Sequence, residues 1–262
     1  MKGSGAIADR LHIVAAVNDE DVLDNNLKRS DMVASGRVAL SCYRGAKSAA
    51  QAYNEGLDDT SAEIIVFAHQ DVFFPDAWEA ELERAITLIE AEDPNWAVIG
   101  AWGIDTDGEF QGHAWSSGLS RRLGGRFERP REIECIDEFV IIVRRASGLR
   151  FDETLPGFHL YAADIVLAAR QAGLKSYVAD IPAIHNSKPV PSYSGGYSDA
   201  WLFMRKKWRD VLPIRTLTVP LSRSLWPLFR ARLRLWRSRR MRFENANDPK
   251  TDPRELARHL EP

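Results

Sequence analysis

The segment that most constrains this chain is a short apolar run, residues 64–68, and the polar group that ends it. The run reads Ile-Ile-Val-Phe-Ala and is followed by His69, Gln70 and Asp71. β-Branched and aromatic residues in a run of this length predict a buried strand. Open α/β sheets bind their ligands at the carboxyl ends of their strands. A carboxylate there can hold a divalent cation, and the cation can hold a diphosphate.

Strand-like and helix-like patterns alternate through the first 100 residues, and further predicted elements follow along the chain. Predicted strands cover residues 11–17, 63–68, 96–100 and 176–181, and predicted helices cover 46–57, a segment beginning at Pro75, 162–172 and 199–209. This alternation predicts an α/β fold with a mostly parallel central sheet flanked by helices. Residues 133–143 form a strand pair or one long bent strand. Residues 103–131, rich in Gly, Ser and Arg, are predicted to be a functional loop or a mobile lid.

Composition limits the class of protein. The 262 residues, 45% of them hydrophobic, are enough for one large domain with or without an appendage. Two cysteines, Cys42 and Cys135, give no metal or disulfide framework, which favours a reducing cytosol. The first ten residues lack the apolar core of a signal peptide, and no apolar run is long enough to span a bilayer. We therefore expect a cytoplasmic protein.

The charges are divided unevenly along the chain. Residues 205–242 carry 13 Lys and Arg but one acid, whereas residues 1–204 carry 19 basic and 31 acidic residues. An acidic body does not fit a nucleic-acid-binding protein, and we expect no nucleic acid partner. We divide the chain into a catalytic domain, 1–210, and a basic helical extension, 211–262.

The extension contains a predicted basic amphipathic helix at 223–242. Leu225, Phe229, Leu233 and Trp236 lie at helical spacing with arginines around them. One interpretation is a helix lying on an anionic membrane surface, which would place the protein at the inner face of the membrane. The other is a helix packed on the body, with its arginines paired to the acidic domain. Beyond Phe243 the chain turns polar, and we expect it to fray.

Ionisable residues occur where predicted elements end. Asp19 and Glu20 follow the first strand, Asp71 follows the second, Asp164 begins a helix and His185 follows the last strand. Because the carboxyl ends of parallel strands share one edge of a sheet, these groups are expected to converge. Each also has an ordinary structural explanation, as a turn residue, a helix-terminal acid or a strand-end side chain.

Several segments, taken together, resemble the nucleotide-sugar glycosyltransferases of the GT-A fold, especially glycosyltransferase family 2. The segments are Val14–Glu20, Ala46–Leu57, Phe67–Val72, Gly157–Gly173 and Val178–Ser187. Their order and spacing carry the resemblance, which spans roughly residues 11–210. It implies a Rossmann-like sheet and a transferase that takes a nucleotide-diphosphate sugar as donor. The acceptor would be a glycan or a lipid-linked molecule, as in polysaccharide biosynthesis.

The resemblance also implies roles for particular residues. Phe67–Val72 occupies the place of the family's D-x-D motif, so Asp71 corresponds to its metal-binding acid and His69 replaces the first acid. Asp71 and His185 would hold Mn²⁺ or Mg²⁺, and an imidazole ligand suits Mn²⁺ better than a pure carboxylate site would. His69 would contact the donor or act as a further ligand.

The remaining roles concern the donor base, the acceptor and the proton. Asp164 would be the base that deprotonates the acceptor hydroxyl in a single, inverting displacement. Asp19 or Glu20 would bind the base or ribose of the nucleotide. Acceptor contacts are expected from Asp137, Glu138 and His159. Asp137 and Glu138 fall in an apolar segment, where carboxylates need partners, either nearby arginines or sugar hydroxyls. His159 either lines the acceptor pocket or packs.

Two other functions are weighed against this one. A non-catalytic GT-A-like module that binds a glycan or nucleotide sugar is suggested by His69, because one carboxylate of the metal motif is missing. A nucleotidyltransferase on a related α/β sheet is disfavoured, because no Gly-rich loop bearing Lys or Arg follows the first strand.

Overall fold

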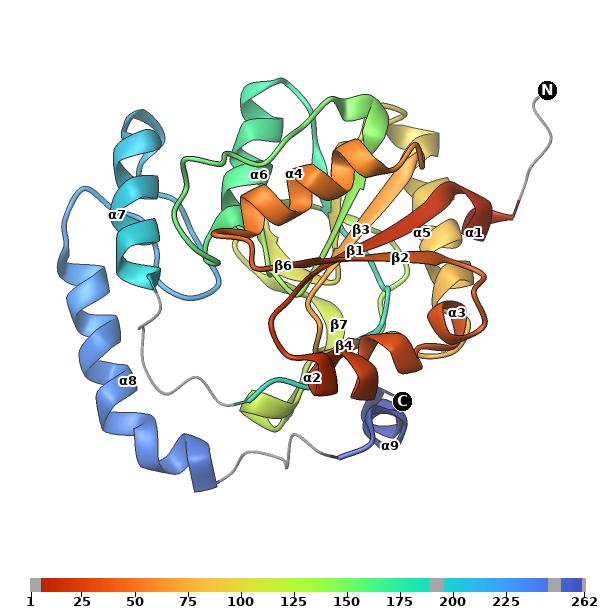
Figure 1. Cartoon of the computed structure of the whole chain (residues 1–262). Coiled ribbons are helices and arrows are strands. Elements are labelled where there is room, and N and C mark those ends of the chain that lie inside the picture. Colours follow the sequence, from red (N-terminus) through yellow and green to blue (C-terminus); the bar gives the residue numbers. More distant parts are fainter. Residues whose placement is uncertain (1–5, 189–195, 245–250, 261–262) are drawn as a thin grey trace.

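A mixed β-sheet forms the centre of the molecule. The computed structural model describes residues 6–188, 196–244 and 251–260 (Figure 1). The sheet has 12 strands in the order β2-β1-β3-β10-β5-β11-β9-β6-β7-β12-β4, with β8 paired to β7. The strands are β1 Leu11–Val17, β2 Ala39–Arg44, β3 Ile64–Ala68, β4 Val72–Phe73, β5 Val98–Gly100, β6 Trp102–Asp105, β7 Phe110–Ser116, β8 Arg121–Gly124, β9 Arg131–Ile136, β10 Val140–Arg144, β11 Ser176–Val178 and β12 Ala183–His185.

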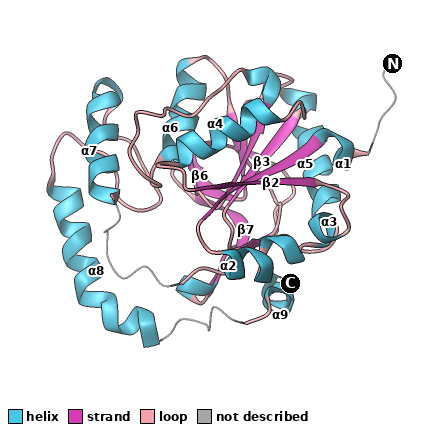
Figure 2. Ribbon diagram, in the orientation of Figure 1, coloured by secondary structure: helices cyan, strands magenta, loops and turns pink. Residues whose placement is uncertain are grey.

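Helices lie on both sides of this sheet (Figure 2). They are α1 Ile7–Arg10, α2 Glu20–Asn25, α3 Asp31–Ala34, α4 Ala49–Asp59, α5 Trp78–Glu92, α6 Tyr161–Gln171, α7 Tyr197–Lys207, α8 Trp226–Glu244 and α9 Pro253–Ala257. The predicted α/β class is therefore confirmed. Among the described residues, no helix combines the length and the apolar character that crossing a bilayer requires.

The direction of the strands differs from the prediction. β2, β1, β3, β5 and β11 run the same way, but β10 lies antiparallel between β3 and β5. Beyond β11 all pairs except β7–β12 are antiparallel. The expectation of a mostly parallel sheet was therefore wrong for the sheet as a whole. The physical reason is that β9 already runs antiparallel to β11, and the short Asp137–Phe139 bend carries the chain on in that direction into β10, without the helical crossover that a parallel strand needs.

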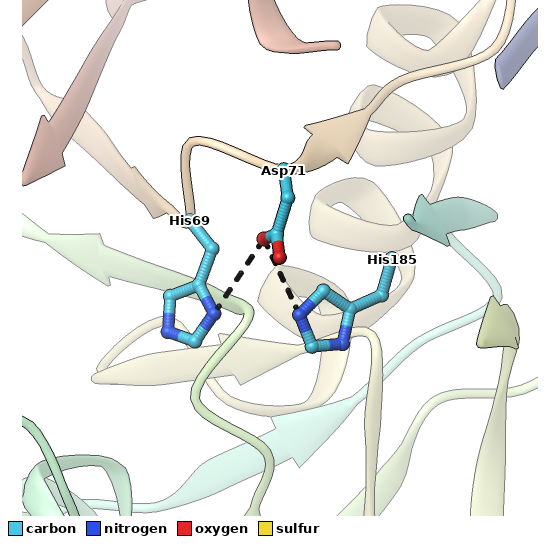
Figure 3. Close-up of side chains that lie close together, drawn as sticks. All are labelled: His69, Asp71 and His185. Atoms are coloured by element: carbon cyan, nitrogen blue, oxygen red, sulfur yellow. Dashed lines mark ion pairs between the residues drawn. The ribbon is translucent and has the colours of Figure 1, made fainter. Parts of the chain in front are cut away.

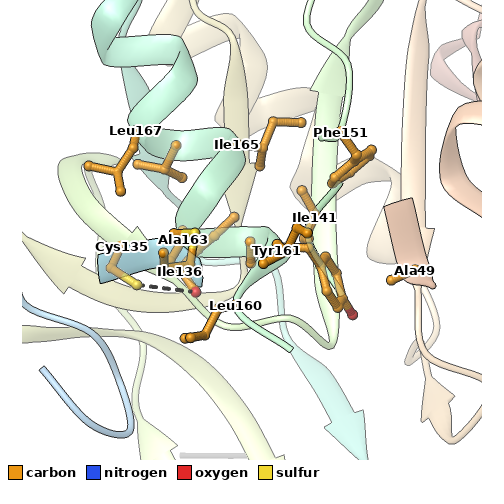
Figure 4. Close-up of a cluster of buried hydrophobic side chains, with 14 of the residues drawn as sticks. Ala49, Cys135, Ile136, Ile141, Phe151, Leu160, Tyr161, Ala163, Ile165 and Leu167 are labelled. Carbon is orange, nitrogen blue, oxygen red and sulfur yellow. Dashed lines mark hydrogen bonds between the residues drawn. The ribbon is translucent and has the colours of Figure 1, made fainter. Parts of the chain in front are cut away.

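Alternating residues of the central strands face two separate cores. Val14 of β1, with Ile65 and Phe67 of β3, packs under α4 and α6 in one core. Figure 4 shows another part of this core, around Ile141 and Ile165. Their neighbours Ile13 and Val66 pack against α5 and the amino-terminal helices in the other. Side chains of a strand point alternately to the two faces, and both faces here are covered. This double burial explains why the predicted strands read as continuous apolar runs.

The predicted loop at 103–131 is instead largely β-structure. It contains most of β6, all of β7 and β8, and a turn at Gly108, which has φ +91°. Gly112 has φ +139°, and a Cβ atom there would lie 2.2 Å from the Ala101 carbonyl oxygen. Tight pairing in this region thus depends on glycines that made the sequence look irregular.

The carboxyl-terminal part also differs from the prediction in one respect. The basic helix predicted at 223–242 is present as α8, and its Leu228 and Ala231 join the main core. Residues 253–257 form α9, although fraying was expected there. Leu256 of α9 and Leu260 after it pack on Phe73 and Ile184, and this apolar contact explains why the segment is ordered. The domain boundary at residue 210 stays a prediction.

A close contact between α4 and β1 generates the first testable prediction. A Cβ atom on Gly56 would lie 2.4 Å from Val14 Cγ1, which belongs to a fully buried, rigid side chain. Overpacking costs about 1–3 kcal/mol, which exceeds the roughly 1 kcal/mol that alanine gains over glycine in a helix. Gly56→Ala should therefore lower the free energy of unfolding, measured by urea denaturation.

The matched control is Gly125→Ala, because a Cβ atom at Gly125 meets nothing within 4 Å. That variant should unfold at the same urea concentration as the wild type. Equal or greater stability of Gly56→Ala would show that α4 and β1 are not packed this closely.

Candidate functional site

Three ionisable side chains lie close together at the carboxyl ends of β3 and β12. His69 and Asp71 lie in the turn between β3 and β4, and His185 is the last residue of β12 (Figure 3). Antiparallel pairing of β4 with β12 sets His185 opposite Val72. The Asn186 amide also donates to the Asp71 carbonyl oxygen at 2.8 Å. The predicted convergence of Asp71 and His185 is therefore observed, with His69 beside them.

The three side chains point toward one another. Asp71 Oδ1 lies 3.3 Å from His185 Nε2 and 4.0 Å from His69 Nδ1. One ligand atom of each residue lies within 4.8 Å of those of the other two. Asp71 Oδ1 is buried, and beyond its ion pair with His185 it has no partner among the described residues. An unsatisfied buried carboxylate oxygen of this kind fits a cation ligand.

Burial and mutual charge set the protonation of the three groups. Burial lowers the pKa of His69 to about 4, which keeps that imidazole neutral. Burial alone would raise the pKa of Asp71, but the charge of His185 outweighs it and the pKa falls to about 2. Burial acts to lower the pKa of His185, yet the neighbouring Asp71 carboxylate raises it. Asp71 is thus an anion, and a proton on His185 competes with any metal.

Tyr161 determines which nitrogen of His69 is available. The Tyr161 hydroxyl donates to the Glu138 carbonyl oxygen at 3.3 Å, so its oxygen accepts from His69 Nε2 at 2.7 Å. The neutral ring then carries its hydrogen on Nε2, and the lone pair of Nδ1 faces Asp71. A partner that fixes the tautomer in this way is usual for metal-binding histidines. A carboxylate with two imidazoles suits Mn²⁺ or another transition ion better than Mg²⁺.

A cavity of about 840 Å³ adjoins this cluster. The residues that line it include His69, His185, Asp137, Glu138 and His159. Phe139 stacks on the His185 ring, with centroids 5.1 Å apart, and so holds the imidazole at the cavity wall. Four of the predicted metal and acceptor residues, His185, Asp137, Glu138 and His159, therefore line one cavity, whereas Asp71 is not part of the lining and contacts it through His185.

Asp137 and Glu138 lie in the bend between β9 and β10, not inside one strand. The Leu160 amide donates to the Glu138 carboxylate, and His159 Nδ1 lies 4.0 Å from Glu138 Oε2. Burial, with the neighbouring charge of Asp137, raises the pKa of Glu138 to about 8. A carboxyl group poised near neutral pH beside a cavity has the acid strength expected of a general base or acid.

Asp164 lies outside the cavity lining. Its carboxylate is buried and bound on both oxygens, by Lys207 Nζ at 2.8 Å and by Trp208 Nε1 at 2.7 Å. Ala163, one residue earlier on α6, lines the cavity instead. The geometry of Asp164 suits the anchoring of α6 to the carboxyl-terminal end of α7, and the catalytic role of Asp164 stays a prediction.

Asp19 and Glu20 likewise do not line the cavity. Asp19 caps α2 by accepting from the Val22 amide at 3.2 Å, and Glu20 pairs with Arg44. Gln70 connects this turn to the cluster, because its Oε1 accepts from the Asp19 amide at 3.1 Å. The two acids therefore lie at the neighbouring strand end, and donor binding by either of them stays a prediction.

The residues that contact the cluster from distant parts of the sequence were not predicted. Tyr161 and Phe139 come from other elements, and no local pattern marks either as a neighbour of His69 or His185. Asn186 also donates from its side-chain amide to the Thr251 carbonyl oxygen at 3.2 Å, which ties the end of β12 to the carboxyl-terminal segment. The position of Asn186 directly after His185 is the one feature of the sequence that could have marked it as a neighbour of the cluster.

Comparison with known proteins places the sequence. Residues 12–195 match the model of a family described as a glycosyltransferase-like family. The match confirms the predicted family and the predicted class of enzyme. A curated relative from Fuscovulum blasticum, the ATP synthase subunits region ORF 6 protein, is 29% identical over 133 residues, 48% of this chain and 52% of the relative. The chain thus matches about half the length of that relative.

Two solved structures illustrate the distant similarities in fold. The mannosyltransferase PcManGT from Pyrobaculum calidifontis, in complex with GDP-Man and Mn²⁺, is 10% identical, with 96% of this chain and 80% of that chain covered and a TM-score of 0.47. GalNAc-T7, with UDP, GalNAc and Mn²⁺, is 12% identical, with 95% and 56% covered and a TM-score of 0.45. Similarities this distant do not inform the substrate of this chain.

Proposed function

The chain belongs to the glycosyltransferase-like family, and we propose that it transfers a sugar from a nucleotide-diphosphate sugar to a hydroxyl group of a glycan or lipid-linked acceptor. The observation that carries this proposal is the cluster of His69, Asp71 and His185, whose two imidazoles line a cavity that Asp137 and Glu138 also line. A metal-ligand set and a candidate base share one space there, as a displacement at a sugar carbon requires.

The donor side is assigned to the cluster. Asp71, His185 and His69 Nδ1 would hold a divalent cation, for which we favour Mn²⁺ because two of the three ligands are imidazoles. A cation bound there would offset the negative charge that develops on the departing nucleoside diphosphate. Arg121 and Lys188 line the same cavity and supply further positive charge for the phosphates. Asp19 or Glu20 would bind the nucleoside from the adjoining strand end.

The acceptor side is assigned to the bend after β9. Glu138 would take the proton of the acceptor hydroxyl group while the oxygen of that hydroxyl attacks the anomeric carbon. Asp137 and His159 would bind and orient the acceptor sugar. A single displacement of this kind inverts the anomeric configuration. Glu138 replaces Asp164 as our first choice of base, because both carboxylate oxygens of Asp164 are already bound.

One alternative keeps a specific observation in its favour. His69 stands where related enzymes carry an acid, so a binding module that holds a nucleotide sugar without turnover is the second candidate. Turnover decides between the two. A panel of nucleotide-diphosphate sugars, assayed for nucleoside diphosphate release with and without EDTA, should give EDTA-sensitive release for the transferase and none for the module.

Substitution of a single cluster residue should weaken Mn²⁺ binding while the protein still folds. Asp71→Asn and His185→Gln should each lower Mn²⁺ affinity by roughly a hundredfold, since each removes a ligand and loss of even a supporting residue costs 10- to 100-fold. Titration calorimetry of the full chain with Mn²⁺ measures this directly. Asp76→Asn, an exposed acid nearby, is the matched control and should bind as the wild type does. Equal Mn²⁺ affinity in all three variants would contradict the assigned ligands.

The choice of base makes a prediction about pH. Because the raised pKa of Glu138 is about 8, kcat/KM should rise as pH rises through about 8, where the deprotonated base forms. Glu138→Gln should lower kcat by roughly 10²–10⁴-fold and remove that pH dependence, while donor binding persists. Asp164→Asn should retain the pH dependence and should instead lower the melting temperature. The opposite pattern, with the pH dependence lost in Asp164→Asn alone, would restore Asp164 as the base.

A further inference from the structure

The helix α8 carries two apolar rows on different sides. Leu228, Ala231 and Leu235 are buried and pack the helix onto the body. A second row faces solvent, and its exposed fractions are Trp226 59%, Phe229 57%, Leu233 37% and Trp236 71%, with Leu225, directly before the helix, at 53%. Positions separated by three or four residues lie on the same side of a helix, so the exposed row is continuous. Packing on the body therefore leaves one apolar side of α8 uncovered.

Aromatic residues dominate the exposed row. Trp226 and Phe229 stack on each other with centroids 5.6 Å apart, and both remain more than half exposed. Scattered exposed apolar residues are ordinary, but an aligned row with two tryptophans indicates a contact surface. Tryptophan is favoured where an apolar medium meets water, because its ring is apolar and its N–H is polar. In Figure 1 the helix runs along the outer edge of the molecule, where an extended surface can reach it.

Arginines flank this row and define the charge of its partner. Arg230, Arg234 and Arg237 are exposed, and none of them forms an ion pair with another residue in the described parts of the chain. With Trp226 and Leu233 they line a groove of about 610 Å³. The expected pairing of the tail's arginines with the acidic body is therefore not observed for these three. Unpaired guanidinium groups in a groove fit phosphate oxygens, which they bind with two N–H groups at once.

We propose that the exposed row of α8 docks on the surface of an anionic phospholipid bilayer. The aromatic and leucine side chains enter the boundary between headgroups and acyl chains, and the three arginines bind lipid phosphates. A helix with an apolar row beside a basic flank is the arrangement that such interfaces bind. A nucleic acid would use the arginines but would leave most of the apolar row exposed, so the bilayer explains more of the surface.

The docking face adjoins the proposed site. Thr218 lines both the groove and the main cavity, and Leu235 on the buried side of α8 also lines that cavity. Three exposed apolar residues, Phe110, Leu119 and Phe158, line the cavity as well. A bilayer held by α8 would therefore lie close to the cavity. If the chain transfers a sugar as proposed, a bilayer at this position implies a lipid-linked acceptor. This consequence, unlike the docking itself, rests on the proposed function.

Vesicle binding tests the docking proposal without any sugar substrate, so its outcome does not depend on the proposed transfer reaction. The full chain is sedimented with vesicles of phosphatidylcholine alone and with vesicles that also contain phosphatidylglycerol. We expect binding to the anionic vesicles, with a partition constant that falls as salt is added. The triple variant Arg230→Gln, Arg234→Gln, Arg237→Gln should lower that constant roughly a hundredfold, since each basic side chain contributes about a fivefold factor.

A matched variant controls for net charge. Arg129, Arg131 and Arg170 are exposed arginines on the body, and their joint replacement by glutamine should leave vesicle binding close to that of the wild type. Thermal melting of both triple variants verifies that they fold.

A second pair of variants tests the apolar row. Trp226→Ala with Trp236→Ala should lower vesicle binding at least tenfold, whereas Leu88→Ala, an exposed leucine on α5, should not. The proposal would be overturned if the wild-type protein did not bind anionic vesicles, or if both arginine triple variants lowered the partition constant equally. A dimer that dissociates in Trp236→Ala, without vesicle binding, would assign the row to a second copy of the chain instead.

Discussion

The candidate site depends on the pairing of two very short strands. β4 and β12 share two residue pairs, Ile184 with Phe73 and His185 with Val72, and this pairing brings Asp71 and His185 together. So short a pairing needs support from packing. The carboxyl-terminal segment provides it, since Leu256 and Leu260 cover Phe73 and Ile184. The last part of the chain thus stabilises a site built by its middle.

Unbalanced negative charge is the second constraint. Asp71 keeps an unsatisfied oxygen, and the lone pair of His69 Nδ1 faces it, so the cluster is arranged to receive positive charge. A proton on His185 meets part of that need in the free protein. Nearby, Glu138 stays protonated up to about pH 8 because it is buried beside Asp137. The site therefore combines a cation-binding end with a carboxyl group poised for proton transfer, and the family assignment gives this combination its chemical meaning.

Sequence reasoning succeeded where the signal was local. The run at 64–68 predicted β3 and the polar cluster after it, because a buried strand needs no information beyond its own residues. It failed where partners distant in sequence decide the outcome. The direction of β10 follows from β9, which pairs antiparallel with β11. The β-structure of 103–131 depends on glycines that permit close pairing, and the order of α9 depends on Phe73 and Ile184. The role of Tyr161 is invisible locally, since its partner His69 lies 92 residues away. Asp164 followed the expected pattern, yet Lys207 and Trp208 occupy its carboxylate.

We infer that Asp71, His185 and His69 hold one divalent cation beside the bound diphosphate. Anomalous diffraction from crystals grown with Mn²⁺ and a nucleoside diphosphate tests it most directly. We expect a manganese peak within bonding distance of Asp71 Oδ1 and of the two imidazoles, with the diphosphate in the same cavity. Diphosphate bound in the cavity with no manganese between Asp71 and His185 would contradict it.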